Sequence, residues 1–128
     1  MLDIGAGSGA YDGLFEECSE KVNLDPSEEL LKLNKSPKIR NIAGKAEKMP
    51  FEDDSFDIIV SLSALHHVQD IDRAVSEIKR AAKKGAQLAF SFFKRADNLD
   101  EWIDAIRQSF NVMKEIDEGK DLILICSN

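Results

Sequence analysis

The feature that most constrains the fold of this chain is a short apolar run that ends in three glycines. Residues 1–4 are followed by Gly5, Gly7 and Gly9 within a window of five residues. An apolar run, a glycine cluster and a helix-like segment, in this order, indicate a strand, a tight loop and a helix. Because ordering a glycine costs backbone entropy, three together indicate that a ligand approaches the backbone closely, beside a helix N-terminus.

Two classes of ligand, and a turn without a ligand, are compatible with this loop. The spacing Gly5-x-Gly7-x-x-Ala10 fits the dinucleotide fingerprint, and Asp25 lies where that fingerprint places a ribose-binding acid. Asp3 favours a cationic ligand instead, because a carboxylate at the mouth of the loop repels a pyrophosphate. S-adenosylmethionine has an ammonium, a sulfonium and a ribose but no phosphate, so it fits better. A plain turn needs only one glycine.

Length and composition indicate one globular domain that spans residues 1–128. Apolar residues make up 43% of the chain and charged residues 32%, which is ordinary for a folded protein. The net charge of −7 argues against non-specific binding of nucleic acid, which needs a basic face. No apolar run approaches the roughly 18 residues of a membrane span, and no basic-then-apolar leader is present. We therefore expect no membrane association.

The cysteines and histidines bear on location and metal binding. Cys18 and Cys126 lie far apart in apolar surroundings, which is typical of reduced thiols in a cytoplasmic protein. His66 and His67 are adjacent, and neither cysteine has the spacing of a metal ligand. No metal site is therefore expected.

Hydrophobic periodicity predicts alternating strands and helices. The predicted strands cover residues 1–4, 21–24, 38–42, 55–62, 87–93, 110–116 and 122–126. Helices are predicted at residues 10–18, from residues 25–29 to about residue 36, from the Asp70 cap to a stop at Gly85, and at residues 99–109. The last two strands are joined by a short loop that contains glycine, which predicts an antiparallel hairpin.

This order of elements predicts an α/β fold. It is a doubly wound, mostly parallel seven-stranded sheet with a C-terminal antiparallel hairpin. Ligands of such sheets bind beyond the carboxyl ends of the strands, where the strand order reverses. The glycine loop, Asp25 and the loops after Ile42 and Val60 all belong to that edge.

Five segments, in the right order and at the right spacing, resemble the class I S-adenosylmethionine-dependent methyltransferases. The closest likeness is to the branch that includes ubiquinone and menaquinone methyltransferases and many small-molecule enzymes. The segments are residues 2–9 (LDIGAGSG), 23–27 (NLDPS), 44–51 with 54–57 (GKAEKMPF, DSFD), 61–68 (SLSALHHV) and 83–85 (KKG). The resemblance covers nearly the whole chain. It implies a Rossmann-like methyltransferase that uses S-adenosylmethionine and a small-molecule acceptor of unidentified structure.

The resemblance also implies a set of cofactor-binding residues. They are Asp3, Gly5, Ala6, Gly7, Gly9, Asp25, Pro26, Ser27, Ala46, Glu47, Ser61 and Leu62. Asp3 and the backbone of Gly5 and Gly7 would hold the ammonium of the methionine part. Ser61 and Leu62 would lie beside the same part, although Ser61 could equally be no more than the end of a strand.

The adenosine part of the cofactor would meet a second group of residues. Asp25 would accept hydrogen bonds from both ribose hydroxyls, with Pro26 and Ser27 beside the adenine. Ala46 would offer its backbone N–H to the ring, and Glu47 would accept from the amino group. Simpler interpretations remain open at two of these positions: Asp25 as a helix cap only, and Glu47 as a solvated loop acid.

His66 and His67 are the candidates for acid–base catalysis, because histidine titrates near neutral pH. They follow the predicted fourth strand, at the functional edge. Packing or capping is an equally open role for both. Methyl transfer from a sulfonium needs mainly alignment of the nucleophile, the methyl group and the leaving sulfur, so an essential base is not required.

Two departures from the family leave alternative functions open. The chain begins at the first predicted strand, without the helical cap that relatives carry before it, and residues 94–109 are short. We therefore expect an open substrate site, or one covered by a homodimer or a partner subunit. The alternatives are a non-catalytic S-adenosylmethionine-binding or regulatory subunit and, third, a nicotinamide-dependent oxidoreductase. An Asn/Asp-Pro-Pro-aromatic segment is absent after the fourth strand, which disfavours amino groups of adenine or glutamine as acceptors.

Overall fold

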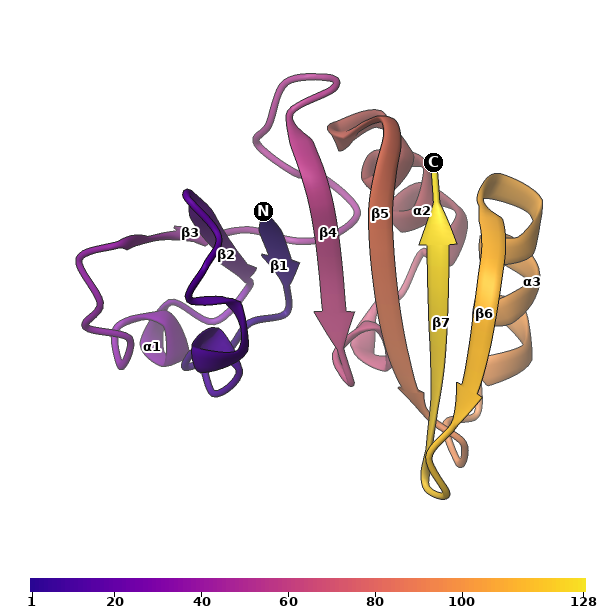
Figure 1. The fold of residues 1–128 in the computed structure, drawn as a ribbon. Coiled ribbons are helices and arrows are strands. Elements are labelled where there is room, and N and C mark those ends of the chain that lie inside the picture. The colour runs from indigo at the N-terminus through magenta and orange to yellow at the C-terminus, as the bar shows by residue number, and fades with distance from the viewer.

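One seven-stranded sheet organises the computed structural model, which describes residues 1–128 (Figure 1). The strands lie in the order β3-β2-β1-β4-β5-β7-β6. Their bounds are β1 Leu2–Ile4, β2 Lys21–Asp25, β3 Ile39–Ala43, β4 Phe56–Leu62, β5 Ala82–Phe93, β6 Asn111–Asp117 and β7 Asp121–Ser127. The helices are α1 Glu28–Leu31, α2 Ile71–Ala81 and α3 Leu99–Ser109, with single 3₁₀ turns η1 Asp12–Phe15 and η2 Leu65–His67.

The pairing of the strands confirms the predicted fold class. Strands β1 to β5 are parallel to one another, whereas β7 is antiparallel to both β5 and β6. The chain lays down β1, β2 and β3 in one direction and then returns to place β4 beside β1. The strand order therefore reverses between β1 and β4, and the glycine loop that follows β1 lies at this point.

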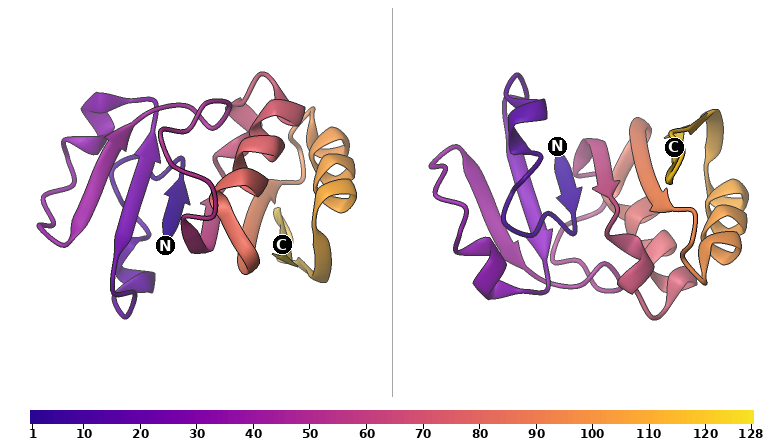
Figure 2. Two further views of the ribbon diagram at one scale, coloured as in Figure 1. Left: turned by 90° about the horizontal axis from the view of Figure 1, so that it is seen from above. Right: turned by 90° about the horizontal axis from the view of Figure 1, so that it is seen from below.

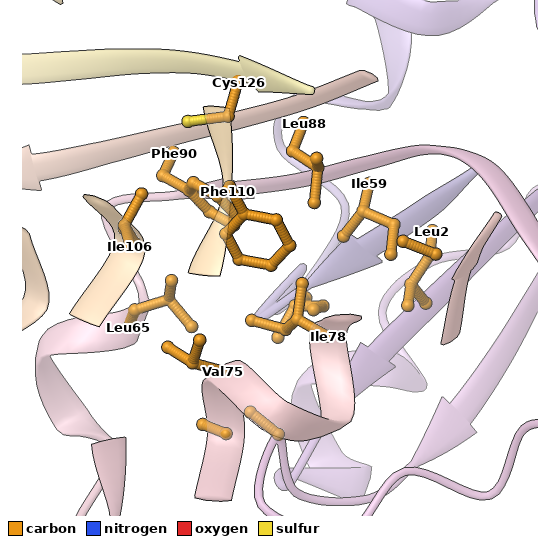
Figure 3. Packing of buried hydrophobic residues seen from close by; sticks show 14 of the residues in the cluster. Leu2, Ile59, Leu65, Val75, Ile78, Leu88, Phe90, Ile106, Phe110 and Cys126 are labelled. Atoms are coloured by element: carbon orange, nitrogen blue, oxygen red, sulfur yellow. The ribbon is translucent and has the colours of Figure 1, made fainter. Parts of the chain in front are cut away.

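The apolar core lies between the sheet and the helices α2 and α3 (Figure 3). Side chains of β1, β4, β5 and β7 point from the sheet toward those of α2 and α3. The labelled members are Leu2, Ile59, Leu65, Val75, Ile78, Leu88, Phe90, Ile106, Phe110 and Cys126. Burial of these side chains at about 25 cal/mol per Å² of apolar surface is the main stabilising contribution to the fold.

Helices α2 and α3 lie on the same side of the sheet, over β4, β5, β7 and β6 (Figure 2). No helix covers the opposite face of these strands (Figure 1). That face leaves Ile58, Leu62, Ile123 and Ile125 partly exposed. None of the helices combines the length and the apolar character that are needed to cross a bilayer.

Helix α2 begins and packs as predicted, but its end differs. The Asp70 carboxylate accepts from the N–H of Arg73 at 3.1 Å and caps the helix, and Ala74, Val75 and Ile78 are buried. The helix ends at Ala81, and Gly85 belongs to β5 instead of stopping the helix. The register between β4 and β5 shifts at this point, so residues 83–86 form an irregular entry to the strand.

The predicted helix at residues 10–18 is wrong. Only the single 3₁₀ turn η1 forms there, and its one leucine, Leu14, is 72% exposed instead of packing on the sheet. Gly13 disfavours the helix, and the turn is held by the polar contacts of Asp12 instead of by an apolar face. Helix α1 is likewise a single turn, shorter than predicted, with Leu31 as its one buried residue.

Candidate functional site

The glycine loop turns back sharply after β1. Gly5, Gly7 and Gly9 have φ values of +77°, +56° and +82°, in the left-handed region that side chains disfavour. The N–H of Gly5 donates to the carbonyl of Leu24 at 2.7 Å. A methyl group at Gly5 would collide with the Cβ of Ala64, in the loop after β4. Glycine is therefore required for the close approach of the loops that follow β1 and β4.

Asp25 closes the loop from the end of β2. Its Oδ2 accepts from the N–H of Gly7 at 2.9 Å, and its Oδ1 accepts from the N–H of Ser27 at 2.8 Å. The residue that caps α1 is Ser27, whose Oγ accepts from the N–H of Leu30 at 3.3 Å. Each carboxylate oxygen can accept a further hydrogen bond. Asp25 is thus a fixed, nearly buried acceptor between the glycine loop and α1.

A buried cluster of charges lies beside the loop. Lys21 forms an ion pair with Asp12 and lies with its Nζ 3.8 Å from a carboxylate oxygen of Asp3. Burial raises the pKa of Asp3 to about 6, against the lowering effect of Lys21, and the nearby Asp12 and Asp25 raise it further. Asp3 is therefore already the neighbour of a protein cation, and a cofactor ammonium would be a second one.

A cavity of about 250 Å³ opens at the carboxyl edge of β1 and β2. Its walls come from the end of β1, the end of β2, the loop after β3 and the loop after β4. The predicted residues in its lining are Gly5, Pro26, Ala46, Glu47 and His67. The other lining residues are Ile4, Leu24, Gly44, Lys45, Ala64, Leu65, Val68 and Gln69. The lining combines apolar surface with a few polar groups, as ligand cavities commonly do.

The loop between β3 and β4 is tied to helix α2. The Met49 N–H donates to the Glu77 carboxylate at 2.8 Å. The Arg80 guanidinium donates to the carbonyls of Met49 and Phe51 at 3.2 and 2.6 Å, and it pairs with Glu77 and Asp53. The hydrogen bonds to Glu77 and Asp53 raise the pKa of Arg80, and the Arg80 hydrogen bond lowers that of Glu77. These contacts fix the loop that carries Ala46 and Glu47, both of which line the cavity.

The histidines follow β4 in the turn η2. Their ring centroids are 3.9 Å apart, and the His66 ring meets Phe93 edge-on at 5.3 Å. Burial lowers the pKa of His66, and the adjacent His67 lowers it further, which favours the neutral imidazole. The buried Nδ1 of His66 has no hydrogen-bond partner. His67 is exposed and lines the cavity.

The remaining predicted residues lie around the cavity instead of in its wall, and these include Asp3, Gly7, Asp25, Ser27 and His66 described above. Ser61 is fully buried, and its Oγ donates to the Ile4 carbonyl at 2.7 Å, so its hydroxyl joins β4 to β1. Leu62 is half-buried at the end of β4. Ala6 and Gly9 form the turn itself, with a 2.9 Å hydrogen bond from the Gly9 N–H to the Ala6 carbonyl.

Sequence reasoning missed Ala64, Lys45 and Gln69 as cavity residues. A signal for Ala64 exists in retrospect, because a small residue is needed opposite Gly5. Gln69 contributes its backbone N–H, which donates to Glu47 Oε1 at 3.1 Å. A backbone contact of this kind leaves no trace in residue type.

Comparison with known proteins places this geometry in a family. Residues 2–90 match the family described as "Methyltransferase domain". The uncharacterized methyltransferase YcgJ of Bacillus subtilis is 34% identical over 121 residues, which cover 84% of this chain and 47% of that protein. The malonyl-[acyl-carrier protein] O-methyltransferase of Methylococcus capsulatus is 36% identical over 104 residues, 75% of this chain and 38% of that protein. The chain thus spans less than half the length of these curated relatives.

Solved structures support the same assignment. The crystal structure of YcgJ superposes with a TM-score of 0.76 at 26% identity, over 90% of this chain and 64% of that chain. An S-adenosylmethionine-dependent methyltransferase from Mesorhizobium loti gives a TM-score of 0.84 at 19% identity, over 99% of this chain and 89% of that chain. The second likeness concerns the fold alone. With the family match and the glycine-loop geometry, it follows that the chain belongs to the class I S-adenosylmethionine-dependent methyltransferases.

Proposed function

We propose that this protein binds S-adenosylmethionine in the cavity at the carboxyl edge of β1 and β2 and transfers its methyl group to a small-molecule acceptor. The observation that carries the proposal is the Asp25 carboxylate, which the N–H groups of Gly7 and Ser27 hold at the rim of a glycine loop. A fixed carboxylate with free acceptor capacity suits two adjacent ribose hydroxyls. Family membership supports methyl transfer over a purely regulatory or a nicotinamide-dependent role.

Residues in the cavity wall and beside it would match the parts of the cofactor. Ala46 and Glu47 would take the adenine, with Pro26 and Ser27 beside it, and Asp25 would take the ribose. The shape of the cavity depends on glycine at position 5, because a Cβ there would collide with Ala64 and force the loops after β1 and β4 apart. The cofactor would supply a methyl group activated by a sulfonium.

The methionine end of the cofactor would lie along the glycine loop. Asp3 and the backbone of Gly5 and Gly7 would bind its ammonium, with Ala6 and Gly9 shaping the loop. Ser61 and Leu62 would support this end from β4, Ser61 through the strand backbone because its hydroxyl already bonds to Ile4. Asp3 would then share its charge between Lys21 and the ligand.

The chain's own contribution to catalysis would be alignment and the exclusion of water. Holding the acceptor atom, the methyl carbon and the sulfur in line would lower the activation free energy, because binding has already ordered the reacting atoms. His67 lines the cavity and a lowered pKa favours the neutral form of His66, so either can accept a proton from an acceptor hydroxyl or amine. We propose these two residues as the candidate bases at the acceptor side.

The acceptor is proposed only as a small molecule. One relative is a malonyl-[acyl-carrier protein] O-methyltransferase, and another is a demethylmenaquinone methyltransferase from Renibacterium salmoninarum, 34% identical over 73% of this chain. These two names describe acceptors of unrelated chemistry. Similarity to them therefore supports a methyl acceptor but selects no particular one.

Calorimetric titration with S-adenosylhomocysteine, with NAD alongside, tests the proposed function. We expect micromolar binding of the first and none of the second. Asp25→Ala should weaken S-adenosylhomocysteine binding at least tenfold while the far-ultraviolet circular dichroism stays unchanged. Asp104→Ala, which removes an exposed acid from α3, is the matched control and should bind normally. Normal binding by Asp25→Ala would remove Asp25 from the site.

Assembly and location complete the proposal. We propose that a second chain, in a homodimer or from a partner subunit, covers the open side of the cofactor site. The bare sheet face with Ile58, Ile123 and Ile125 supports this, and light scattering of the purified protein checks the homodimer. The free thiols of Cys18 and Cys126 support a cytoplasmic location.

A further inference from the structure

Helix α2 and the residue that precedes its cap hold Glu47, a residue of the cavity wall, at two separate atoms. Arg73 donates from its Nε to the Glu47 carbonyl at 2.9 Å. The N–H of Gln69, just before the helix, donates to Glu47 Oε1 at 3.1 Å. Glu47 is thereby fixed at its backbone by α2 and at its side chain by the segment that leads into α2.

This arrangement leaves one acceptor of Glu47 free. Oε2 makes no hydrogen bond in the structure, whereas Oε1 is occupied by Gln69. A carboxylate oxygen accepts hydrogen bonds and cannot donate them when ionised. A ligand group that donates a proton would therefore be favoured at Oε2, and one that only accepts would be repelled.

We propose that Arg73 is a positioning residue that makes the cavity specific for a 6-aminopurine over a 6-oxopurine, by fixing the Glu47 carboxylate. This inference rests on the proposed function, because it takes the adenine of the cofactor to lie at Glu47. Arg73 itself touches no ligand. The Asp70 cap fixes the Arg73 backbone through its N–H, and the Arg73 guanidinium holds the Glu47 carbonyl and so restrains the Glu47 side chain.

The relative affinity for two ligands distinguishes a positioning role of Arg73 from a role in general stability, because loss of stability would weaken both ligands equally. S-adenosylhomocysteine carries an amino group at position 6 of the purine, and S-inosylhomocysteine carries an oxo group. The wild-type protein should bind the adenosyl form at least tenfold more tightly, since a built hydrogen-bonding site rejects a mismatched partner strongly. Glu47→Gln should abolish this preference, because an amide can donate as well as accept.

In Arg73→Ala the preference should fall at least threefold through weaker binding of the adenosyl form, with binding of the inosyl form unchanged within twofold. Arg73→Lys should recover part of the preference, because an ammonium also donates to a carbonyl. Lys79→Ala is the matched control: it removes a cation from the same helix that bonds to Ser109 and Asn128. Equal weakening of both ligands in Arg73→Ala, or an unchanged preference, would overturn the inference.

A ligand-free measurement keeps this test separate from the proposed function. If the wild type does not bind S-adenosylhomocysteine, the proposed function fails, and the positioning role can still be judged. Amide hydrogen exchange at Gln69, whose N–H bonds to Glu47, should be at least threefold faster in Arg73→Ala than in the wild type or in Lys79→Ala. An unchanged exchange rate would show that Arg73 does not position Glu47.

Discussion

The two halves of the sheet are stabilised by different interactions. In the half formed by β4 to β7, with α2 and α3, large apolar side chains fill the interior. The half formed by β1 to β3 is more polar: of the six buried polar or charged residues of the chain, four lie on β1 and β2. These four are Asp3, Lys21, Asn23 and Asp25.

The two kinds of interaction contribute differently: apolar burial mainly stabilises the fold, whereas buried polar contacts mainly fix the positions of side chains. Apolar burial is non-directional and contributes most of the folding free energy. Buried ion pairs contribute little net stability, because desolvation offsets their attraction, but they fix the positions of the groups they join. In the half that carries the glycine loop, the buried contacts therefore mainly position side chains. We expect the free energy of local opening to be lower in this half than in the half formed by β4 to β7.

The largest effect expected from this comparison is that of Trp102→Ala in α3. The Trp102 side chain is fully buried and packs against Phe92, with ring centroids 5.7 Å apart. Its removal leaves a cavity in the core half and should lower the free energy of unfolding by about 3–5 kcal/mol, measured by urea denaturation. Met113→Ala, at an exposed residue of β6, should change it by no more than about 0.5 kcal/mol. Equal effects of the two would contradict the comparison.

The next effect concerns pH and the polar half. The pKa of Asp3 is about 6 in the folded protein against an ordinary 3.8, so between these values the folded state binds more protons than the unfolded state. The contribution of Asp3 to stability is thus fully present below pH 3.8 and is lost as the pH rises through 6. The loss amounts to about 2–3 kcal/mol and should vanish in Asp3→Asn.

Urea denaturation of both proteins across this pH range isolates the contribution of Asp3. The stability of the wild type relative to Asp3→Asn should fall as the pH rises. Asp104→Asn, at an exposed position in the core half, should run parallel to the wild type. A pH-independent difference between wild type and Asp3→Asn would show that burial does not raise the pKa of Asp3.

The smallest effects come from the helix caps, one in each half. Asp70→Ala should lower the free energy of unfolding by about 1 kcal/mol, because α2 packs four buried residues into the core. Ser27→Ala removes the equivalent hydrogen bond from α1, a single turn with one buried residue, and should cost about half as much. Thermal denaturation compares the two, and a larger loss for Ser27→Ala would reverse the assignment of stability to the halves.

Most of the fold could be predicted because apolar residues recur at the spacing of a helix or of a strand wherever one face of that element is buried. Helix α3 occupies Leu99–Ser109, the predicted range, since Trp102, Ile103 and Ile106 mark one face. The strands match their predicted ranges within one residue, except for β5. Its early start depends on Asn128, whose side-chain amide donates to the carbonyls of Ala82 and Lys83. The residue types at positions 82–86 give no sign of this contact with the C-terminal residue, so the early start of β5 could not be predicted.

The sequence predicted where the candidate site lies in the fold, but it predicted few of the contacts between the site's residues. The sequence places the glycine loop, Asp25 and Glu47 at one edge of the sheet, because parallel strands share their carboxyl ends. Pairing between residues far apart in sequence was not predictable, as in the cluster of Asp12 with Lys21 or the hold of Arg73 on Glu47. The roles of the individual site residues stay predictions until a ligand is bound.

The placement of β1 between β2 and β4 has a consequence for how the cavity comes into being. Leu2 pairs with Val22 on one side and with Ile59 on the other, so the second pairing closes a long stretch of chain. Closing a loop of that length costs roughly 3–4 kcal/mol in chain entropy before any contact offsets it. The cavity walls after β1, β2 and β3 lie within that stretch of chain, and the wall after β4 lies beyond it, so neither part of the chain forms the cavity by itself.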